Sequence, residues 1–321
     1  MVINCIIDGN YVLSRLVFTL HKNNLLYGAL YQALENAVSN YRAWYPFSRV
    51  YFVSDSREKS WRKKLNTEYK SHRKKDTDID WKFVYDTYNQ FKLDATNVNV
   101  FECARVEGDD WISLITSDRN SRGESTFIVT NDHDIKQLIK MDIDSEWINI
   151  MSNEMYNKSK VYMPKNYQMF YDKISKKRND DIFNLNNNSE FLKFYDKLHK
   201  KNEVDEVDHV EALMIKIISG DRSDNIPSVW RTTSPTGKTR GIGVKGAKGI
   251  YDYYIQEFGE VKLEDPDMVE NFADLICEKK KLSKTNIDSI SKRIMENFKI
   301  MDLDTGNIPP NILTEMKELY G

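Results

Sequence analysis

Two aspartates three residues apart, Asp221 and Asp224, are side chains whose type and spacing point to chemistry. They follow an apolar stretch, residues 208–218, whose hydrophobic residues recur at the spacing of one buried helix face, and Gly220 is suited to end that helix. Two carboxylates held close together repel each other unless a cation lies between them, and Mg²⁺ prefers such oxygen ligands. The pair predicts a divalent cation site just beyond the helix, although an isolated Asp-x-x-Asp is more often a solvated turn.

A second motif, Gly241-Ile242-Gly243, lies a short way further along the chain, followed by Lys245 and Lys248. Glycines leave room where a backbone must come close, and the amide groups at the start of the helix predicted after them favour a phosphate. The two lysines add positive charge there. The motif therefore predicts a phosphate-binding turn, with an ordinary loop as the alternative.

Acidic residues also end three short apolar segments, at 2–7, 49–54 and 125–130, and a fourth segment, at 97–103, leads into an acidic helix start. Such segments are typical of buried parallel strands, whose carboxyl ends meet at one edge of the sheet, where ligands bind. Helix capping is the simpler reading of each acidic residue. Together they form a set that a parallel sheet would gather: Asp8, Asp55, Glu107, Asp109, Asp110, Asp132, Asp134, Asp221 and Asp224. Oxygen-only ligation without histidine or cysteine favours magnesium or manganese.

Residues 57–75 form a basic stretch with nine Lys or Arg residues against two Glu, a local balance of +7 in a chain of net charge −2. Such a concentration of charge suits a phosphate backbone, although a charge run is usually a solvated face. Trp61 and Tyr69 are interleaved with the cations, as expected where bases stack on aromatic rings, and Arg62 lies beside them. The stretch predicts a nucleic-acid interface.

Length and cysteine content narrow the class of protein. A chain of 321 residues can bury a sizeable core, as one large domain or two smaller ones. Its three cysteines are far apart in the sequence, which predicts a reducing cytoplasm and neither a disulfide framework nor a zinc site. No apolar run is long enough to span a membrane, and a signal peptide is not expected.

A family resemblance emerges from these motifs. Gly-Asp-Arg-Ser-Asp-Asn-Ile-Pro at 220–227, with Gly-Ile-Gly-Val-Lys-Gly-Ala at 241–247, resembles the helix-three-turn-helix signature of the 5′ nuclease superfamily. That superfamily includes flap endonucleases, the 5′ nuclease domains of bacterial DNA polymerases and phage ribonuclease H, and the chain is most similar to the phage type. Glu-Gly-Asp-Asp at 107–110 resembles the family's Glu-Ala-Asp-Asp. Residues 130–138 resemble its Ser-x-Asp-x-Asp-x-x-Gln-Leu, with Thr130 in place of serine.

The resemblance implies an α/β fold, with a central, mainly parallel sheet flanked by helices. It divides the chain into a nuclease core at 1–206, with a basic helical arch at about 56–90, and a helix-three-turn-helix region at 207–321. Two parts depart from the family pattern: an insertion at about 150–206, of which 175–188 is polar and expected to be exposed and partly disordered, and a lengthened link at 230–240. Residues 147–150 and 160–163 are expected to form a hairpin.

The resemblance also implies a function: metal-dependent hydrolysis of phosphodiesters from 5′ ends, as 5′-3′ exonuclease, flap endonuclease and ribonuclease H, including primer removal in DNA replication. Two Mg²⁺ or Mn²⁺ ions would be held by the nine acidic residues, the first by those from Asp8 to Asp110 and the second by those from Asp132 to Asp224. Lys70 and Arg73, expected on one helical face, would grip the scissile phosphate, Arg15 would lie near the bound strand, and a monovalent cation is a further candidate at the helix-three-turn-helix.

The implied partners are duplex DNA or an RNA–DNA hybrid with a 5′ end or flap, and replication proteins such as a single-stranded-DNA-binding protein or a clamp, for a monomeric, stand-alone nuclease. Three alternatives stay open. One is a catalytically silent factor that binds branched DNA, which all nine acidic positions argue against. The others are a metal phosphatase and a small PIN-like ribonuclease. A phosphatase of the haloacid dehalogenase type needs Asp-x-Asp after the first strand, and Asp8-Gly9-Asn10 does not supply it. PIN-like ribonucleases lack the helix-three-turn-helix whose signature this chain resembles.

Overall fold

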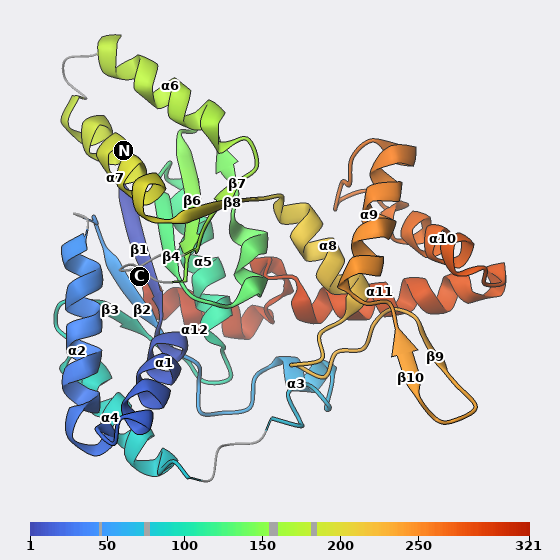
Figure 1. Cartoon of the computed structure of the whole chain (residues 1–321), viewed down its shortest axis with the longest axis horizontal. Helices are drawn as coiled ribbons and strands as arrows, with labels where there is room; N and C mark the ends of the chain where they lie inside the picture. The colour runs from blue at the N-terminus through green and yellow to red at the C-terminus, as the bar shows by residue number, and fades with distance from the viewer. Residues whose placement is uncertain (45–46, 74–77, 154–159, 181–184) are drawn as a thin grey trace. The chain divides into compact units, whose positions relative to one another are not determined.

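The computed structural model describes residues 1–44, 47–73, 78–153, 160–180 and 185–321. They form two compact units. Unit 1 comprises residues 1–60, 75–208 and 303–321, and unit 2 comprises residues 61–74 and 209–302. The position of one unit relative to the other is not determined, so each is described by itself (Figure 1).

Unit 1 is built on an eight-stranded sheet with the order β3-β2-β1-β4-β6-β7-β8, and β5 pairs with β6 (Figure 1). All pairings are parallel except β5 with β6 and β6 with β7. The strands are β1 Ile3–Asp8, β2 Val50–Val53, β3 Asn99–Phe101, β4 Ser125–Val129, β5 Met141–Asp142, β6 Trp147–Ser152, β7 Lys160–Pro164 and β8 Glu203–Val207. The four strands and the antiparallel pair expected from the sequence are confirmed, as is the mainly parallel α/β class.

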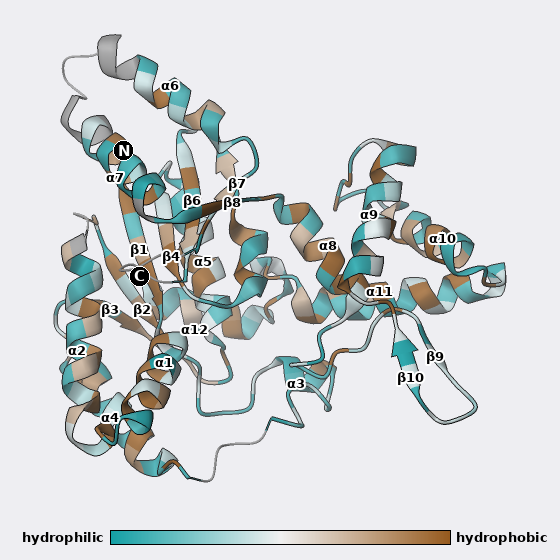
Figure 2. Ribbon diagram, in the orientation of Figure 1, coloured by the Kyte–Doolittle hydropathy of each residue, from teal (hydrophilic) through white to brown (hydrophobic). Residues whose placement is uncertain are grey.

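Helices pack on this sheet, and Figure 2 shows hydrophobic stretches along its strands and both hydrophobic and hydrophilic faces on its helices. The central strands are apolar on both faces because both are covered; every residue of β1, β2 and β4 is buried. The helices of unit 1 are α1 Gly9–Lys22, α2 Leu26–Trp44, α4 Trp81–Asp94, α5 Gly108–Ser121, α6 Tyr167–Asp180, α7 Leu185–Lys201 and α12 Pro310–Tyr320, with 3₁₀ turns η1 His133–Leu138 and η3 Thr305–Asn307.

The polar segment 175–188 contains parts of two helices. Its residues up to 180 continue α6 and those from 185 begin α7, while 181–184 lie outside the described residues. The two helices are ordered by apolar residues on either side of the polar segment, since Phe170, Ile174, Phe191 and Tyr195 are buried in the core of unit 1. The described part of this segment is therefore helical, and its expected exposure and partial disorder stay predictions.

Unit 2 is mainly helical, with α8 His209–Ser219, α9 Val244–Phe258, α10 Met268–Lys280, α11 Ile287–Met301, the 3₁₀ turn η2 Lys284–Asn286 and the short helix α3 Arg62–Leu65. Its core is formed by apolar faces of α8 to α11, where the rings of Tyr254 and Phe272 stack with centroids 4.1 Å apart. The lengthened link at 230–240 contributes an exposed two-stranded hairpin, β9 Arg231–Thr233 with β10 Thr239–Gly241.

The expected helical arch differs from the described structure. Between 56 and 80 the described residues form only the single turn α3, followed by turns through residue 72. Lys70 has a positive φ of 53°, which is incompatible with a right-handed helix at that residue. The prediction that Lys70 and Arg73 share one face of a helix was therefore wrong; residues 74–77 lie outside the described part of the chain.

Candidate active site

Asp8 and Asp132 approach each other because β1 and β4 are neighbouring parallel strands. Asp8 caps α1, its Oδ1 accepting a hydrogen bond of 3.0 Å from the backbone of Tyr11. The hydroxyl of Thr130, the residue after β4, donates to Asp8 Oδ2 at 2.7 Å and accepts from the amide of Asp132 at 3.0 Å. Thr130 therefore fixes two acidic strand ends with one side chain, a role that the serine-to-threonine change preserves.

Asp55 follows β2, on the other side of β1. Its Oδ1 accepts a hydrogen bond of 2.7 Å from the amide of Gly108, and its own amide donates to Asn10 Oδ1 at 3.3 Å. A Cβ at position 108 would lie 3.2 Å from Asp55 Oδ1, so glycine gives this carboxylate room that alanine would reduce. Asn10 is not among the site residues predicted from the sequence, although it stands only two positions after Asp8.

The acidic start of α5 divides into residues with different tasks. Glu107 is the N-cap and forms a capping box with Asp110, whose Oδ2 accepts from the amide of Glu107 at 3.0 Å. Asp110 is 1% exposed, and Glu107 is also buried. Asp109 is partly exposed in the first helical turn. Glu107 and Asp110 therefore both cap the start of α5, and all three acidic residues stay predicted metal ligands, with Asp109 the most exposed of them.

Electrostatics link the strand ends. The pKa of Asp8 is raised from its ordinary value of 3.8 to about 6, chiefly by burial and also by the nearby charges of Asp55 and Asp132, against the hydrogen bonds from Tyr11 and Thr130. A carboxyl group so placed gains most from a divalent cation, which would replace lost hydration and offset the repulsion. The donor set of carboxylate oxygens fits magnesium or manganese.

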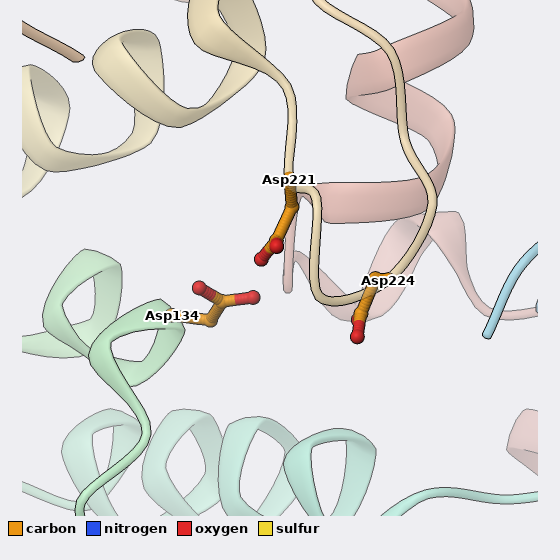
Figure 3. Close-up of side chains that lie close together, drawn as sticks. All are labelled: Asp134, Asp221 and Asp224. Atoms are coloured by element: carbon orange, nitrogen blue, oxygen red, sulfur yellow. The ribbon is translucent and has the colours of Figure 1, made fainter. Parts of the chain in front are cut away.

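Asp221 and Asp224 lie on one tight loop of unit 2, shown in Figure 3. Asp221 and Ile226 exchange two backbone hydrogen bonds across the loop, and Gly220 enters it with φ +68°. Asn297 of α11, itself buried, donates to the carbonyls of Ile217 and Pro227 at 2.8 and 3.0 Å, which fastens both ends of the loop. Asp134, also labelled in Figure 3, belongs to unit 1, where its amide donates to Asp132 Oδ1 at 2.9 Å.

Basic side chains of unit 2 neutralise both loop carboxylates. Lys216 forms an ion pair with Asp221. Although burial alone would raise the pKa of Asp221, hydrogen bonds from Lys216 and Ser223 hold it below its usual value. Lys70 Nζ lies 3.9 Å from Asp224 Oδ2, the backbone amide of Lys70 donates to the Asp224 carbonyl at 2.9 Å, and Arg73 donates to Asp224 Oδ1. Folding therefore brings both expected phosphate-gripping cations to one carboxylate.

Three residues of the basic stretch are buried. Trp61, Arg62 and Tyr69 are 2%, 2% and 4% exposed. Arg62 Nε donates to the carbonyl of Ile300 at 2.8 Å and its guanidinium stacks on Trp61, while Tyr69 packs with Ile226 and Ile300. The expectation that these rings offer exposed faces to bases was wrong, because aromatic residues in a basic run can equally anchor it to a core. Arg62 is likewise a packing residue here.

The remaining expected nucleic-acid contacts lie on α1 and around the start of α9. Arg15 of α1 is partly exposed, donates to the hydroxyl of Tyr41 at 3.1 Å and lies 5.7 Å from the ring centroid of Tyr11. Gly241 ends β10, where a Cβ would come within 2.8 Å of Ser228, and Gly243 is the exposed N-cap of α9. Lys245 and Lys248 are exposed on the first turns of α9, with Lys248 forming ion pairs with Glu211 and Asp252. The first amides of α9 are thus open to an anion.

The fold and this arrangement of carboxylates define an α/β protein with an acidic centre at the carboxyl edge of a mainly parallel sheet. Residues 4–168 match the family described as 5′-3′ exonuclease, N-terminal resolvase-like domain, which covers half of the chain. The protein therefore belongs to the 5′-3′ exonuclease family, within the 5′ nuclease superfamily.

Individual relatives agree with this assignment. The 5′-3′ exonuclease of Mycoplasmopsis pulmonis is 25% identical over 254 residues, covering 78% of this chain and 66% of the relative. That of Buchnera aphidicola subsp. Schizaphis graminum is 27% identical over 161 residues, covering 49% of this chain and 54% of the relative. The chain thus spans less than two thirds of the length of these relatives.

Solved structures show the same fold at low identity. A T5 5′-exonuclease with bound zinc ions aligns over 99% of this chain and 98% of its own, with a TM-score of 0.60 and 16% identity. A T5 flap endonuclease in a pseudo-enzyme–product complex with DNA and metal ions aligns over the same shares, with a TM-score of 0.60 and 18% identity. Separately, none of the helices in the described part of the chain is long and apolar enough to cross a membrane.

Proposed function

We propose that this protein is a metal-dependent 5′ nuclease that hydrolyses phosphodiesters near the 5′ ends of DNA or RNA–DNA hybrids. The observation that carries the proposal is the convergence of Asp8, Asp55 and Asp132 at the carboxyl ends of the neighbouring parallel strands β1, β2 and β4, where Thr130 bonds to both Asp8 and Asp132. Three carboxylates so close together repel one another and destabilise the fold. A purely structural role would not require such a cluster, so a functional role is favoured.

Asp8, Asp55 and Asp132 would hold a divalent cation, with Glu107, Asp109 and Asp110 available beside them. The second cation stays a prediction of the sequence motifs, which assign it to Asp132, Asp134, Asp221 and Asp224. Bound divalent cations lower the pKa of a coordinated water and stabilise charge on the phosphate. The protein's own contribution is to orient the carboxylates: Thr130 holds Asp8, Gly108 holds Asp55, and the capping box holds the start of α5.

Lys70 and Arg73 would bind the scissile phosphate and stabilise the negative charge that develops on it. Both contact Asp224 in unit 2, so their positive charges already lie together, and a phosphate oxygen could replace this carboxylate as their acceptor. The start of α9, with Gly243, Lys245 and Lys248, would bind a duplex backbone as part of a helix-three-turn-helix, with a monovalent cation as a further ligand. Such contacts carry no base information, so selectivity would be for structure.

The natural substrate is proposed to be a 5′ RNA primer segment or a 5′ DNA flap. The same site would then carry out the ribonuclease H, exonuclease and flap endonuclease activities. The setting proposed is DNA replication, of a phage or its host, with a single-stranded-DNA-binding protein or clamp as partner and a monomeric enzyme. The cytoplasm is the proposed location, in keeping with three cysteines that are all free and buried.

The test uses a labelled duplex with a 5′ flap, and a second with a 5′ RNA segment, incubated with magnesium or with chelator. Wild type should release short products from the 5′ end only with metal, and Asp132→Asn should bind the duplex but not cut it. Asp144→Asn, a change of the same kind at an exposed residue of unit 1, serves as the control and should cut normally. Duplex binding without cleavage under every divalent metal would reject the proposal and favour a silent branched-DNA-binding factor.

A further inference from the structure

A cavity of about 450 Å³ opens beside Asp55, between the end of β2 and one face of α4. All of the residues that line it belong to unit 1. Helix α4 contributes Lys82, Tyr85, Tyr88 and Lys92, which recur at helical spacing and so face the cavity together. A cavity of this size is suited to one small ligand, such as a single nucleotide.

The inner wall of the cavity is polar and built from buried groups. The side chain of Lys92 is only 11% exposed; it forms an ion pair with Glu102, lies 3.5 Å from the Ser54 hydroxyl and stacks 4.6 Å from the ring centroid of Tyr88. Tyr88 is 2% exposed, and its hydroxyl makes no hydrogen bond of normal geometry with any described residue. An interior hydroxyl without such a bond is rare, and a ligand that reaches it would satisfy it.

The outer wall offers positive charge and an aromatic ring. Arg57 is exposed, and its Nη2 lies 3.4 Å from the carbonyl of Tyr85, which places the guanidinium over the mouth of the cavity. Lys82 at the rim pairs with Asp86 at 2.7 Å. The lining carries three cations, Arg57, Lys82 and Lys92, against Asp55 and Asp86, a balance of +1. The partly exposed ring of Tyr85 supplies a surface on which a base can stack.

We propose that this cavity binds a nucleoside 5′-monophosphate group, with its phosphate on Arg57 and near the Tyr88 hydroxyl and its base against Tyr85. The inference rests on the proposed nuclease function for the source of the group, which is either the 5′-phosphorylated end of a bound strand or a released mononucleotide. Asp55 lines both this cavity and the acidic centre, so the group would lie next to the bond that is cut. The cavity thereby distinguishes 5′-phosphate from 5′-hydroxyl ends.

Binding is measured without cleavage, in chelator, so that the result is independent of nuclease activity. One arm compares the affinity of the full chain for single-stranded oligothymidylate with a 5′-phosphate and with a 5′-hydroxyl. A second arm titrates thymidine 5′-monophosphate against thymidine. Wild type should favour the phosphate form in at least one arm by about threefold to tenfold, the range of a partly exposed ionic contact. Preference in the first arm identifies the strand end, and in the second the free nucleotide.

Arg57→Ala should abolish the preference, and Tyr88→Phe, which removes only a hydroxyl whose neighbour is Ser54 and so should leave folding intact, should reduce it. The matched control is Lys59→Ala, which removes the same charge from an exposed residue of the same segment that does not line the cavity. No preference in either arm, or a preference that survives Arg57→Ala or is lost equally in Lys59→Ala, would overturn the proposal. If wild type shows the binding preference but no metal-dependent cleavage of the labelled duplexes, the result would contradict the nuclease function and leave the binding proposal standing.

Discussion

Replacing Asp8 by asparagine should stabilise the metal-free protein at neutral pH while abolishing cleavage. In the folded protein the pKa of Asp8 is about 6, against an ordinary value of 3.8. Because the raised pKa means that the folded state binds the proton more tightly, the folded state holds more protons than the unfolded chain between about pH 4 and pH 6. Stability conferred at this residue is therefore complete only below about pH 4 and is lost as the pH rises through about 6.

The size of the effect follows from the difference in pKa. A difference of about two between the folded and unfolded pKa corresponds to about 3 kcal/mol of unfolding free energy, lost in full above pH 6. Asparagine keeps an oxygen for the amide of Tyr11 but carries no charge to desolvate. At pH 7.5 the variant should thus be more stable than wild type by up to about 3 kcal/mol, and at pH 4 the difference should vanish.

The assay is equilibrium urea denaturation at several values between pH 4 and pH 8 in chelator, followed by the same series with magnesium. Asp80→Asn is the control, because Asp80 caps α4 through a 3.1 Å hydrogen bond to Phe83 but is exposed. Magnesium should raise the stability of wild type and of Asp80→Asn but not that of Asp8→Asn, since only the first two retain the full ligand set. Parallel profiles for wild type and Asp8→Asn across the pH range, or a variant less stable at pH 7.5, would refute the reasoning.

Three further changes test other parts of the site. Lys70→Ala or Arg73→Ala should slow single-turnover cleavage by about 10²-fold to 10³-fold with little change in duplex affinity; a loss of affinity alone would assign them to binding. Thr130→Val removes a hydrogen bond that lowers the pKa of Asp8, so the acidic limb of the pH–rate profile should move to higher pH, and Thr130→Ser should restore it; an unmoved limb would contradict the role of Thr130. Gly220→Ala should destabilise the protein by at least about 2 kcal/mol in urea denaturation, because the added Cβ would lie 2.4 Å from the backbone of Pro227. The control is Gly237→Ala, at a similar φ of +78° but with open space around the Cβ, which should cost about 1 kcal/mol. Equal losses in the two variants would show that crowding is unimportant.

The sequence predicted the parallel sheet well because its strands are short, continuous apolar runs, which is the pattern of a strand covered on both faces. It also predicted that Asp8, Asp55 and Asp132 meet, since strand ends share an edge in any parallel sheet. It failed where aromatic residues had two readings. Trp61 and Tyr69 look the same in a sequence whether they stack on bases or anchor a basic segment to a core, and burial distinguished the two.

The sequence by itself determined the α/β class, the family, and the acidic residues that converge, because strand order and residue type are local and periodic information. Only the tertiary structure decided how each carboxylate is held: Thr130 bridging Asp8 and Asp132, Gly108 binding Asp55, and Asp224 drawing in Lys70 and Arg73. It alone exposed the cavity of Arg57, Tyr85, Tyr88 and Lys92 beside Asp55. The physical reason is that a pKa, a hydrogen bond or a cavity depends on atoms that are distant in sequence and adjacent only after packing.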